Sequence, residues 1–183
     1  GFIGNPEPTN LGYGWAKRFL EVQALCYTTQ YPIKIALPRL YNAYGPRDDF
    51  SWETSHVIPA LIRKVVEGGD TVKVWGDGSQ TRSFLYVSDF LEGLMLTLER
   101  HPECDPVNIG SEEEVTILDL VNLIIKIVGS QAHVEFEREK PRGQPRRVGD
   151  YSKAKELLGF KRRVGLAEGI GRTVSWYRGQ QSG

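Results

Sequence analysis

The spacing of apolar residues predicts an alternation of helices and short strands along the chain. Helical spacing and capping signals predict helices over residues 11–31, 56–67, 89–100, 117–128, 153–158 and 166–178. Apolar runs typical of strands occupy residues 33–40, 72–75, 82–87, 107–109 and 133–137. Because the two kinds of segment alternate, we expect an α/β fold.

Polar residues at the predicted helix starts can act as caps. Thr9 or Asn10 can cap the first helix, Ser88 or Asp89 the third, and Thr116 the fourth, which a glycine ends. These residue types supply side-chain oxygens to the unpaired backbone N–H groups of a first helical turn.

Two of the predicted strand regions carry more specific expectations. The run 33–40 is apolar without alternation, which is typical of a strand buried on both faces of a parallel sheet. The strands at 72–75 and 82–87 lie on either side of the turn Gly76-Asp77-Gly78, a pattern that predicts a hairpin.

Composition narrows the class of protein. The 183 residues carry 23 basic and 23 acidic side chains, a balance that argues against a nucleic-acid partner. Cys26 and Cys104 form no disulfide framework, which favours a reducing, cytoplasmic location. The sequence shows neither a membrane-spanning apolar run nor a signal peptide. His101 and His133 have no liganding partners at useful spacing, so we expect no metal site.

A tyrosine and a lysine share one face of the first predicted helix. Tyr13 and Lys17 are four residues apart, and such positions project from the same side of a helix. A neighbouring ammonium favours the phenolate form of a tyrosine, so the pair could exchange a proton with a sugar hydroxyl during hydride transfer. An ordinary half-buried aromatic is an equal alternative. Tyr151 and Lys155 have the same spacing on a short polar helix and lack that setting.

Two polar residues lie where a ligand could bind. Asn42 follows the strand 33–40, and ligands of α/β proteins bind at the carboxyl ends of such strands. It could equally be a turn residue that bonds its own backbone. His56 begins a predicted helix, where its imidazole could donate a hydrogen bond to a substrate or meet a phosphate. A single histidine is more often structural.

Arginines supply the candidate anion sites. Arg82 follows the glycine-rich turn, and its planar guanidinium suits a diphosphate. The basic segment 138–147 contains prolines and a glycine, so we expect a loop that completes an anion site or is simply solvated. The opening Gly1-Phe2-Ile3-Gly4 does not qualify as a dinucleotide-binding loop, because no strand precedes it and prolines follow it.

Taken in order, the motifs resemble the NAD-dependent epimerase/dehydratase family, the extended short-chain dehydrogenases/reductases that act on nucleotide sugars. The motifs lie at residues 6–17 (PEPTNLGYGWAK), 42–46 (NAYGP), 54–59 (TSHVIP), 75–78 (WGDG), 81–84 (TRSF), 107–110 (VNIG), 140–146 (KPRGQPR) and 153–160 (KAKELLGF). Within the family, SHVIP at 55–59 is most similar to the GDP-L-fucose synthase branch. The resemblance covers essentially the whole chain.

The resemblance implies an NAD- or NADP-dependent epimerase, dehydratase or reductase. Tyr13 would be its general acid/base, Lys17 would assist it and hold the nicotinamide ribose, and His56 would lie near substrate and cofactor. The other residues implied for the cofactor and substrate cleft are Leu40, Tyr41, Asn42 and Ala43.

The resemblance also implies the substrate and the assembly. The substrate would be a nucleotide-diphosphate sugar, and two copies would form a homodimer through the helix that carries Tyr13 and Lys17. The implied substrate-binding residues are Asn42, Val57, Ile58, Lys64, Trp75, Arg82 and Arg146, with Arg82 on the diphosphate.

The fold that the resemblance implies is the rear portion of a NAD(P)-binding Rossmann fold plus a smaller α/β substrate-binding lobe. Residues 1–50 and 83–110 would belong to the Rossmann domain, and residues 51–82 and 111–183 to the lobe. The family's phosphate-binding loop, its ribose selector and the Ser/Thr partner of the tyrosine would lie before Gly1. We therefore expect a C-terminal portion that is inactive by itself.

Some residues depart from the family pattern. Arg142 stands where the fucose synthase branch has an acidic residue, and neither Cys26 nor Cys104 matches the cysteine that assists epimerisation. Two alternatives to an enzyme stay open: a truncated module that binds nucleotide-diphosphate sugars without turnover, and an incomplete chain without independent function.

Overall fold

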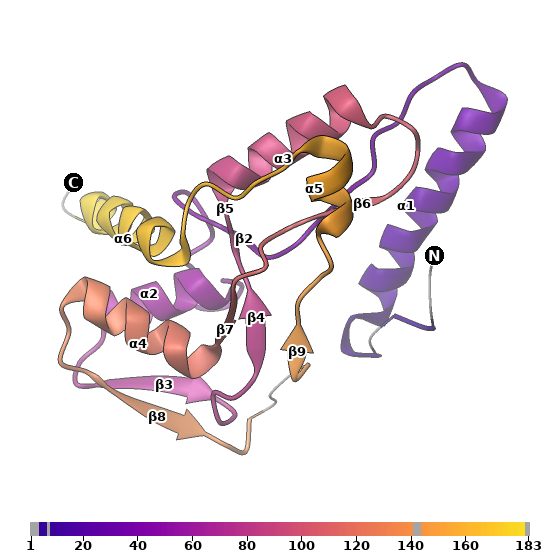
Figure 1. The fold of residues 1–183 in the computed structure, drawn as a ribbon. Coiled ribbons are helices and arrows are strands. Elements are labelled where there is room, and N and C mark those ends of the chain that lie inside the picture. The colour runs from indigo at the N-terminus through magenta and orange to yellow at the C-terminus, as the bar shows by residue number, and fades with distance from the viewer. Residues whose placement is uncertain (1–3, 7, 141–143, 182–183) are drawn as a thin grey trace.

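The computed structural model describes residues 4–6, 8–140 and 144–181, and its architecture is α/β as expected (Figure 1). The helices are η1 (Pro8–Asn10, 3-10), α1 (Leu11–Gln30), α2 (Val57–Glu67), α3 (Val87–Arg100), α4 (Ile117–Val128), α5 (Ser152–Leu158) and α6 (Leu166–Gln181). The strands are β1 (Pro38–Leu40), β2 (Ala43–Tyr44), β3 (Thr71–Trp75), β4 (Thr81–Ser83), β5 (Leu85–Tyr86), β6 (Val107–Ile109), β7 (Glu114–Thr116), β8 (His133–Glu137) and β9 (Arg146–Arg147).

The strands pair mostly with partners far along the chain. β1 pairs with β6, β2 with β5 and β3 with β8, all in parallel. β4 pairs antiparallel with β7 on one edge and parallel with β9 on the other. The predicted hairpin across residues 76–78 is therefore wrong: β3 and β4 flank that turn but lie in different sheets.

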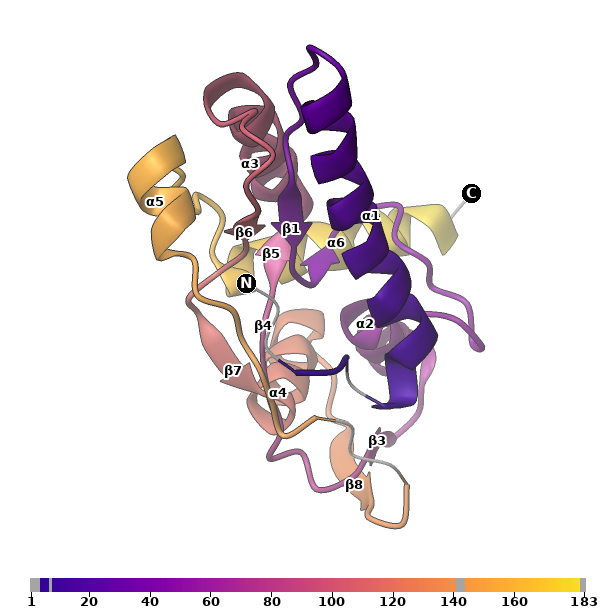
Figure 2. The same cartoon turned by 90° about the vertical axis from the view of Figure 1, so that its right-hand side faces the viewer.

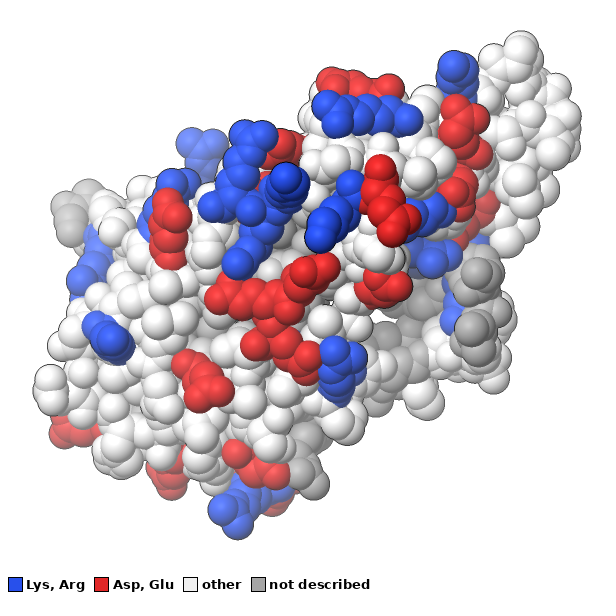
Figure 3. Space-filling model, viewed as in Figure 1, with Lys and Arg blue, Asp and Glu red and all other residues white. Residues whose placement is uncertain are grey.

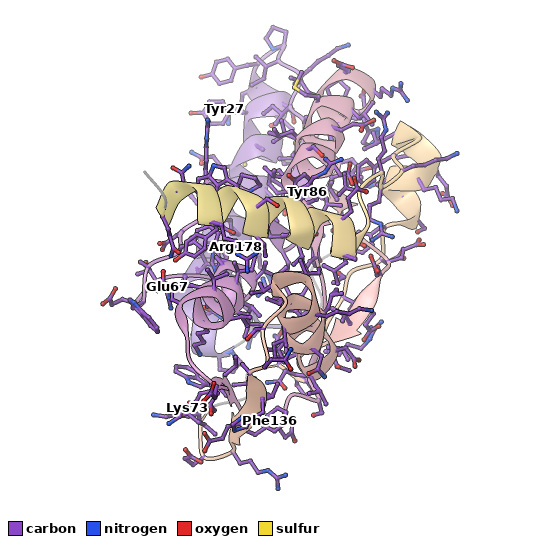
Figure 4. All side chains as sticks on the ribbon, turned by 90° about the vertical axis from the view of Figure 1, so that its left-hand side faces the viewer. Tyr27, Glu67, Lys73, Tyr86, Phe136 and Arg178 are labelled. Carbon is purple, nitrogen blue, oxygen red and sulfur yellow. The ribbon has the colours of Figure 1, made fainter. Side chains whose placement is uncertain are left out.

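The larger core lies among α2, α4, α6 and the β3–β8 pair. Its fully buried side chains include Ile58 and Ile62 of α2 and Leu120 and Ile124 of α4. Figure 4 shows α6 lying across the ends of α2 and α4, with the β3–β8 pair beyond them. The amphipathic faces of three helices thus cover one another, which is the packing that helical periodicity in the sequence requires.

A polar contact fastens α6 to α2 at the edge of this core. The hydroxyl of Tyr177 donates to the Glu67 carboxylate, which also accepts a hydrogen bond of 2.7 Å from the side chain of Gln181. Burial, followed by the hydrogen bond to Glu67, raises the pKa of Tyr177 to about 12. Figure 4 labels Glu67 close to Arg178, whose guanidinium donates to the Val128 carbonyl at the end of α4.

A second, smaller core lies under α3 and α5. Leu85, Val107, Ile109, Leu158 and Phe160 are its larger buried members. It joins β5 and β6 to the short helix α5, so the region after residue 150 is anchored to the middle of the chain.

Helix α4 forms as the sequence predicts. Thr116 Oγ1 accepts a hydrogen bond of 3.0 Å from the backbone N–H of Asp119, which is an N-cap. Gly129 ends the helix in the left-handed conformation, with φ of 75°.

The start of helix α3 differs from the prediction. The helix begins at Val87 with Tyr86 at the N-cap position, so neither Ser88 nor Asp89 caps it. The Asp89 carboxylate is buried instead and accepts backbone N–H bonds from Arg163 and Val164, at 3.0 and 2.9 Å. The residue type was correct for binding backbone amides, but the amides belong to a distant loop.

The expectation of a long, doubly buried strand over residues 33–40 is wrong. Strand β1 covers only Pro38–Leu40, with an isolated bridge from Ile35 to Glu103, and no residue of 33–40 is fully buried. The physical reason is that, among the described strands, β1 has a neighbour on one edge only. The run is as apolar as a central strand without being enclosed like one.

Helix α1 lies at one side of the molecule, separated from the other helices in Figure 1 and in front of the body in Figure 2. None of its described residues is buried, and apolar side chains are exposed all around it. The exposed ones on this helix include Trp15, Phe19, Leu20, Val22, Leu25 and Tyr27. A two-bond ion pair from Arg39 to Glu21, at 2.7 and 2.8 Å, ties the helix to the body.

Candidate functional site

The predicted tyrosine–lysine pair borders a large cavity. Lys17 Nζ lies 5.4 Å from the centroid of the Tyr13 ring, so the helix does place the two groups together. Both side chains line a cavity of about 830 Å³ between α1 and the end of β1, where Leu40 and Tyr41 also contribute. This is the carboxyl end of a parallel strand, the edge at which ligands of α/β proteins bind.

The opposite wall of this first cavity carries positive charge from β9. Arg146 and Arg147 both line it, together with Gln144 and Val148. Arg146 is also tied to the Glu114 carboxylate by two parallel hydrogen bonds of 2.8 and 2.9 Å. That ion pair links β9 to β7. Arg146 therefore has a structural role in addition to the substrate binding predicted for it.

A second cavity, of about 560 Å³, gathers four of the predicted substrate-binding residues. Val57 and Lys64 of α2, Trp75 of β3 and Arg82 of β4 all line it. Arg82 is also the in-register neighbour of Arg147 across the β4–β9 pair. Neighbouring arginines of this strand pair therefore line different cavities, Arg147 the first and Arg82 the second.

The cations of the second cavity lie in a setting that favours an anionic ligand. Partial burial lowers the pKa of Lys64, and its ammonium donates a 2.8 Å hydrogen bond to the Lys73 carbonyl. Burial, followed by the charge of Arg147, lowers the pKa of Arg82. A diphosphate would offset both costs, because it brings negative charge to desolvated cations.

The second cavity also contains residues that the sequence did not single out. Trp52, Glu53, Arg63, Lys73 and Gln80 line it beside the predicted residues. Arg63 is only 3% exposed, and its guanidinium donates to the carbonyls of Phe50 and Ser51. A signal was present: Arg63 occupies an apolar-face position of α2, where a charged residue needs a specific partner.

Four predicted residues line neither cavity: Ile58, Ala43, Asn42 and His56. Ile58 is a fully buried core residue, 1% exposed, and Ala43 lies in β2. Asn42 has a positive φ of 36°, and its amide donates a 2.8 Å hydrogen bond to the Ser83 carbonyl. That bond joins two strand ends and is structural, but its acceptor lies 41 residues along the chain and is not the backbone of Asn42 itself.

His56 lies at the N-cap position of α2 and is exposed. Its neighbours Ser55 and Val57 line the second cavity. Hydrogen bonds from Thr54 and Ser51, and lastly the charge of His56, lower the pKa of the Asp49 carboxyl. The imidazole therefore stands at the rim of this cavity, beside a carboxylate.

In the second tyrosine–lysine pair, Tyr151 and Lys155, the tyrosine is enclosed in the core. Tyr151 is buried, its hydroxyl is 3.1 Å from Ser83 Oγ, and it accepts a hydrogen bond from the Gly149 N–H. A Cβ at Gly110 would lie 2.3 Å from its ring, so only glycine fits there. Sequence spacing alone did not reveal that this tyrosine is enclosed.

Several other features of the described residues bear on the class of site. Cys26 and Cys104 are both free thiols, and the described part contains no group of three or more potential metal ligands. No described helix is long and apolar enough to cross a bilayer. Figure 3 shows basic and acidic side chains interspersed over one face of the molecule. Arg142 and residues 1–3 lie outside the described residues.

The fold and the site define a class. An α/β chain with parallel strand pairs and a cavity at the carboxyl end of one of these strands is typical of Rossmann-like folds. The family model for "NAD dependent epimerase/dehydratase family" matches residues 3–110, and the chain belongs to that family.

Individual relatives agree with this family. The chain is 38% identical over 178 residues to a probable GDP-L-fucose synthase 1 of Oryza sativa subsp. japonica, covering 95% of this chain and 54% of the relative. A GDP-L-fucose synthetase structure from Naegleria fowleri superposes with a TM-score of 0.90 at 25% identity, covering 98% of this chain and 58% of the other. A UDP-glucuronic acid 4-epimerase from Bacillus cereus, in complex with UDP-glucuronic acid and NAD, gives 0.80 at 27% identity, covering 98% and 58%. The chain thus spans about half the length of the curated relatives it matches.

Proposed function

We propose that this chain belongs to an NAD(P)-dependent nucleotide-sugar epimerase, dehydratase or reductase of the GDP-L-fucose synthase type. The observation that carries the proposal is the placement of Tyr13 and Lys17 on the wall of a cavity at the carboxyl end of β1. The rear of a Rossmann domain would comprise residues 1–50 and 83–110, and the substrate lobe residues 51–82 and 111–183.

In this proposal Tyr13 moves the proton. Its side chain is 65% exposed toward the first cavity, so a sugar hydroxyl can reach the phenol oxygen. When bound, NAD or NADP accepts and returns the hydride. Tyr13 takes the hydroxyl proton as the carbonyl forms and returns it on reduction, while Lys17 supplies a positive charge on the same helix face.

The first cavity has the residues needed for the nicotinamide end of such a cofactor. Lys17 offers donors for ribose hydroxyls, and Leu40 and Tyr41 offer an apolar wall. Asn42 and Ala43 would support this wall from behind, and His56 would approach the cofactor and substrate from the rim of the second cavity.

The second cavity would hold the nucleotide diphosphate. Arg82 and Lys64 supply cations for the phosphates, Trp75 supplies an aromatic face, and Val57 adds an apolar contact. Arg146 lines the first cavity, where it could reach the sugar side of the same ligand. Ile58 would act only indirectly, by fixing α2 in the core.

The proposed protein is a homodimer that works in the cytoplasm. The exposed apolar side chains all around α1 favour a second copy as partner, because a lone apolar helix surface is costly in water. Two free thiols are consistent with a reducing compartment.

The experiment is turnover of the full-length protein with a GDP-linked keto sugar and NADPH or NADH. Tyr13→Phe removes the proton donor and should lower kcat by about 100-fold or more, with little effect on nucleotide binding. Tyr27→Phe is the matched control, because it removes a hydroxyl from an exposed tyrosine on the same helix, away from the cavity. Full activity in the Tyr13→Phe variant would exclude the proposed mechanism.

The alternative, a module that binds without turnover, makes a different prediction. It expects nucleotide-diphosphate sugars to bind in calorimetry while NAD(H) and NADP(H) do not. The second cavity favours it as a role of the 183-residue chain by itself, because Lys64, Trp75 and Arg82 line that cavity without any residue of α1. An isolated chain that catalyses turnover would rule it out.

A further inference from the structure

A third side chain continues the face of α1 that carries Tyr13 and Lys17. Glu21 lies four residues after Lys17 in this helix, so the three side chains follow one another along the same face, about one turn apart. All three line the first cavity, and among the described residues that line it Glu21 is the only acidic one. A carboxylate therefore lies about one helical turn from the ammonium that is proposed to assist Tyr13.

A carboxylate in this place competes with Tyr13 for the lysine. Side chains of opposite charge at positions i and i+4 of a helix attract each other, and Lys17 has Tyr13 one turn before it and Glu21 one turn after it. An ammonium that pairs with a carboxylate is drawn away from the phenol, and the carboxylate offsets its charge. Tyr13 would then lose the positive charge that favours its deprotonated form.

Arg39 of β1 binds this carboxylate instead. Its Nε donates to one oxygen of Glu21 at 2.8 Å and its Nη2 to the other at 2.7 Å, so both oxygens have a cationic partner. The Glu21 side chain is only 18% exposed, and solvent and salt screen a partly buried pair less than a surface pair. The hydrogen bonds to Glu21 raise the pKa of Arg39, although partial burial acts in the opposite direction. The carboxylate is therefore held by the strand and not by the helix that carries Lys17.

The two helix cations beside Glu21 differ in what they contact. Arg18, three residues before Glu21, donates a 2.6 Å hydrogen bond to the Gly4 carbonyl. Lys17, four residues before it, lies over the Tyr13 ring and has no anionic partner among the described residues. Without the strand arginine, Lys17 would therefore be the helix cation most ready to pair with Glu21.

The other side of Glu21 faces a smaller cavity, of about 400 Å³, whose second cation already has partners. Besides Arg39, the basic residue that lines this cavity is Lys153. Its ammonium pairs with the Asp105 carboxylate at 2.5 Å and donates to the Pro106 carbonyl at 2.8 Å. A carboxylate released from Arg39 would thus find a cation in use on this side.

We propose that Arg39 is a positioning residue for the proton transfer: by binding Glu21, it leaves the ammonium of Lys17 to Tyr13. Arg39 acts through these two side chains and takes no part in the chemical step. The inference rests on the proposed function, because it assumes that Tyr13 moves a proton with the help of Lys17. The same two hydrogen bonds also tie α1 to β1, so the experiment has to separate the charge effect from the structural tie.

The test is steady-state turnover of the full-length protein with a GDP-linked keto sugar and NADPH or NADH. Arg39→Ala releases the carboxylate and should lower kcat about tenfold, while the KM for the sugar nucleotide stays within about twofold of the parent value. Glu21→Ala breaks the same ion pair but removes the competing carboxylate, so its kcat should stay within about threefold of the parent value. The double variant should recover most of the kcat that Arg39→Ala loses.

A double-mutant cycle with Lys17→Met separates this path from a loss of folding. In the Lys17→Met background, Arg39→Ala should change kcat by less than about twofold, because no ammonium is left to be drawn away. Arg39→Lys keeps a positive charge beside Glu21 and should restore most of the activity. Arg172→Ala is the matched control, because it breaks an exposed arginine–glutamate pair of α6 that lines neither cavity, and it should leave kcat unchanged.

Three results would overturn the inference and leave the proposed function in place. Unchanged kcat in Arg39→Ala would show that the arginine has no such role. Equal losses in Arg39→Ala and Glu21→Ala would show that the ion pair only ties the helix to the strand. A full further loss on adding Arg39→Ala to Lys17→Met would show that the effect does not pass through the lysine. Absence of turnover in the parent protein, or full activity of Tyr13→Phe, would overturn the proposed function and this inference together.

Discussion

At the scale of single residues, Asp89 joins parts of the chain that are more than 70 positions apart. Its buried carboxylate accepts N–H bonds from Arg163 and Val164 and so fixes the loop that leads into α6. Asp89→Ala leaves two amides without an acceptor and should lower the free energy of unfolding by about 3 kcal/mol. Urea denaturation measures this.

The control for that prediction is its neighbour. Ser88 is exposed, and the sequence favours it as a helix cap as much as Asp89. Helix α3 nevertheless begins at Val87, so Ser88 lies inside the helix. Ser88→Ala should change stability by less than about 0.5 kcal/mol. Equal losses in the two variants would show that Asp89 acts through the helix start and not through the distant loop.

The sequence predicted which residues are chemically important more readily than it predicted which residues they contact. Tyr13 and Lys17 needed only helical spacing, which is local, and the structure does bring them to one cavity wall. Tyr151 has the same spacing, but Ser83 and Gly110 enclose it, and no local pattern contains them. Local chemistry is visible in a sequence, whereas enclosure depends on contacts between distant segments.

At the scale of elements, α4 offers a direct test of capping. Thr116→Ala removes the oxygen that accepts the Asp119 N–H and should lower stability by about 1 kcal/mol. Ser175→Ala, on the exposed face of α6, is the control and should be neutral. A thermal melt of each variant compares them, and an unchanged midpoint in Thr116→Ala would contradict a capping role.

Helices were predicted closely and strand pairing was not. The ends of α4 and α5 lie within one residue of the prediction, because caps and glycines act on their own helix. The hairpin failed because β3 pairs with β8, about 60 residues further on. A turn between two apolar runs is a local signal, and the pairing of each run is decided by the rest of the chain.

At the scale of the whole molecule, the apolar surface of α1 predicts self-association. Phe19 is 65% exposed on this helix, and Phe19→Glu places a charge where the proposed homodimer is packed. Sedimentation equilibrium should show the dissociation constant rising at least about 100-fold. Leu91→Glu, at a similarly exposed leucine of α3, is the control and should leave the dimer intact. A monomeric parent chain would refute the proposed assembly.

The candidate site was predicted in its parts but not in its arrangement. Val57, Lys64, Trp75 and Arg82 do meet at one cavity, as the family resemblance implies. The neighbouring Trp52 was missed because its contact with Arg63 spans a loop and a helix. Recognition of a family transfers the positions that its motifs mark, while a contact between a loop and a helix becomes visible only in three dimensions.

The parallel strand pairs have a consequence for how the chain acquires its structure. Strand β1 can pair only after β6 has been brought beside it, and β3 only after β8. More than 50 residues separate the two strands of each pair. Chain entropy must be lost over these long loops before the paired strands gain any contact. We therefore expect helices α2, α4 and α6 to associate early and the arginine-bearing edge at β4 and β9 to order late, so that folding of this chain is slow and limited by closure of this edge.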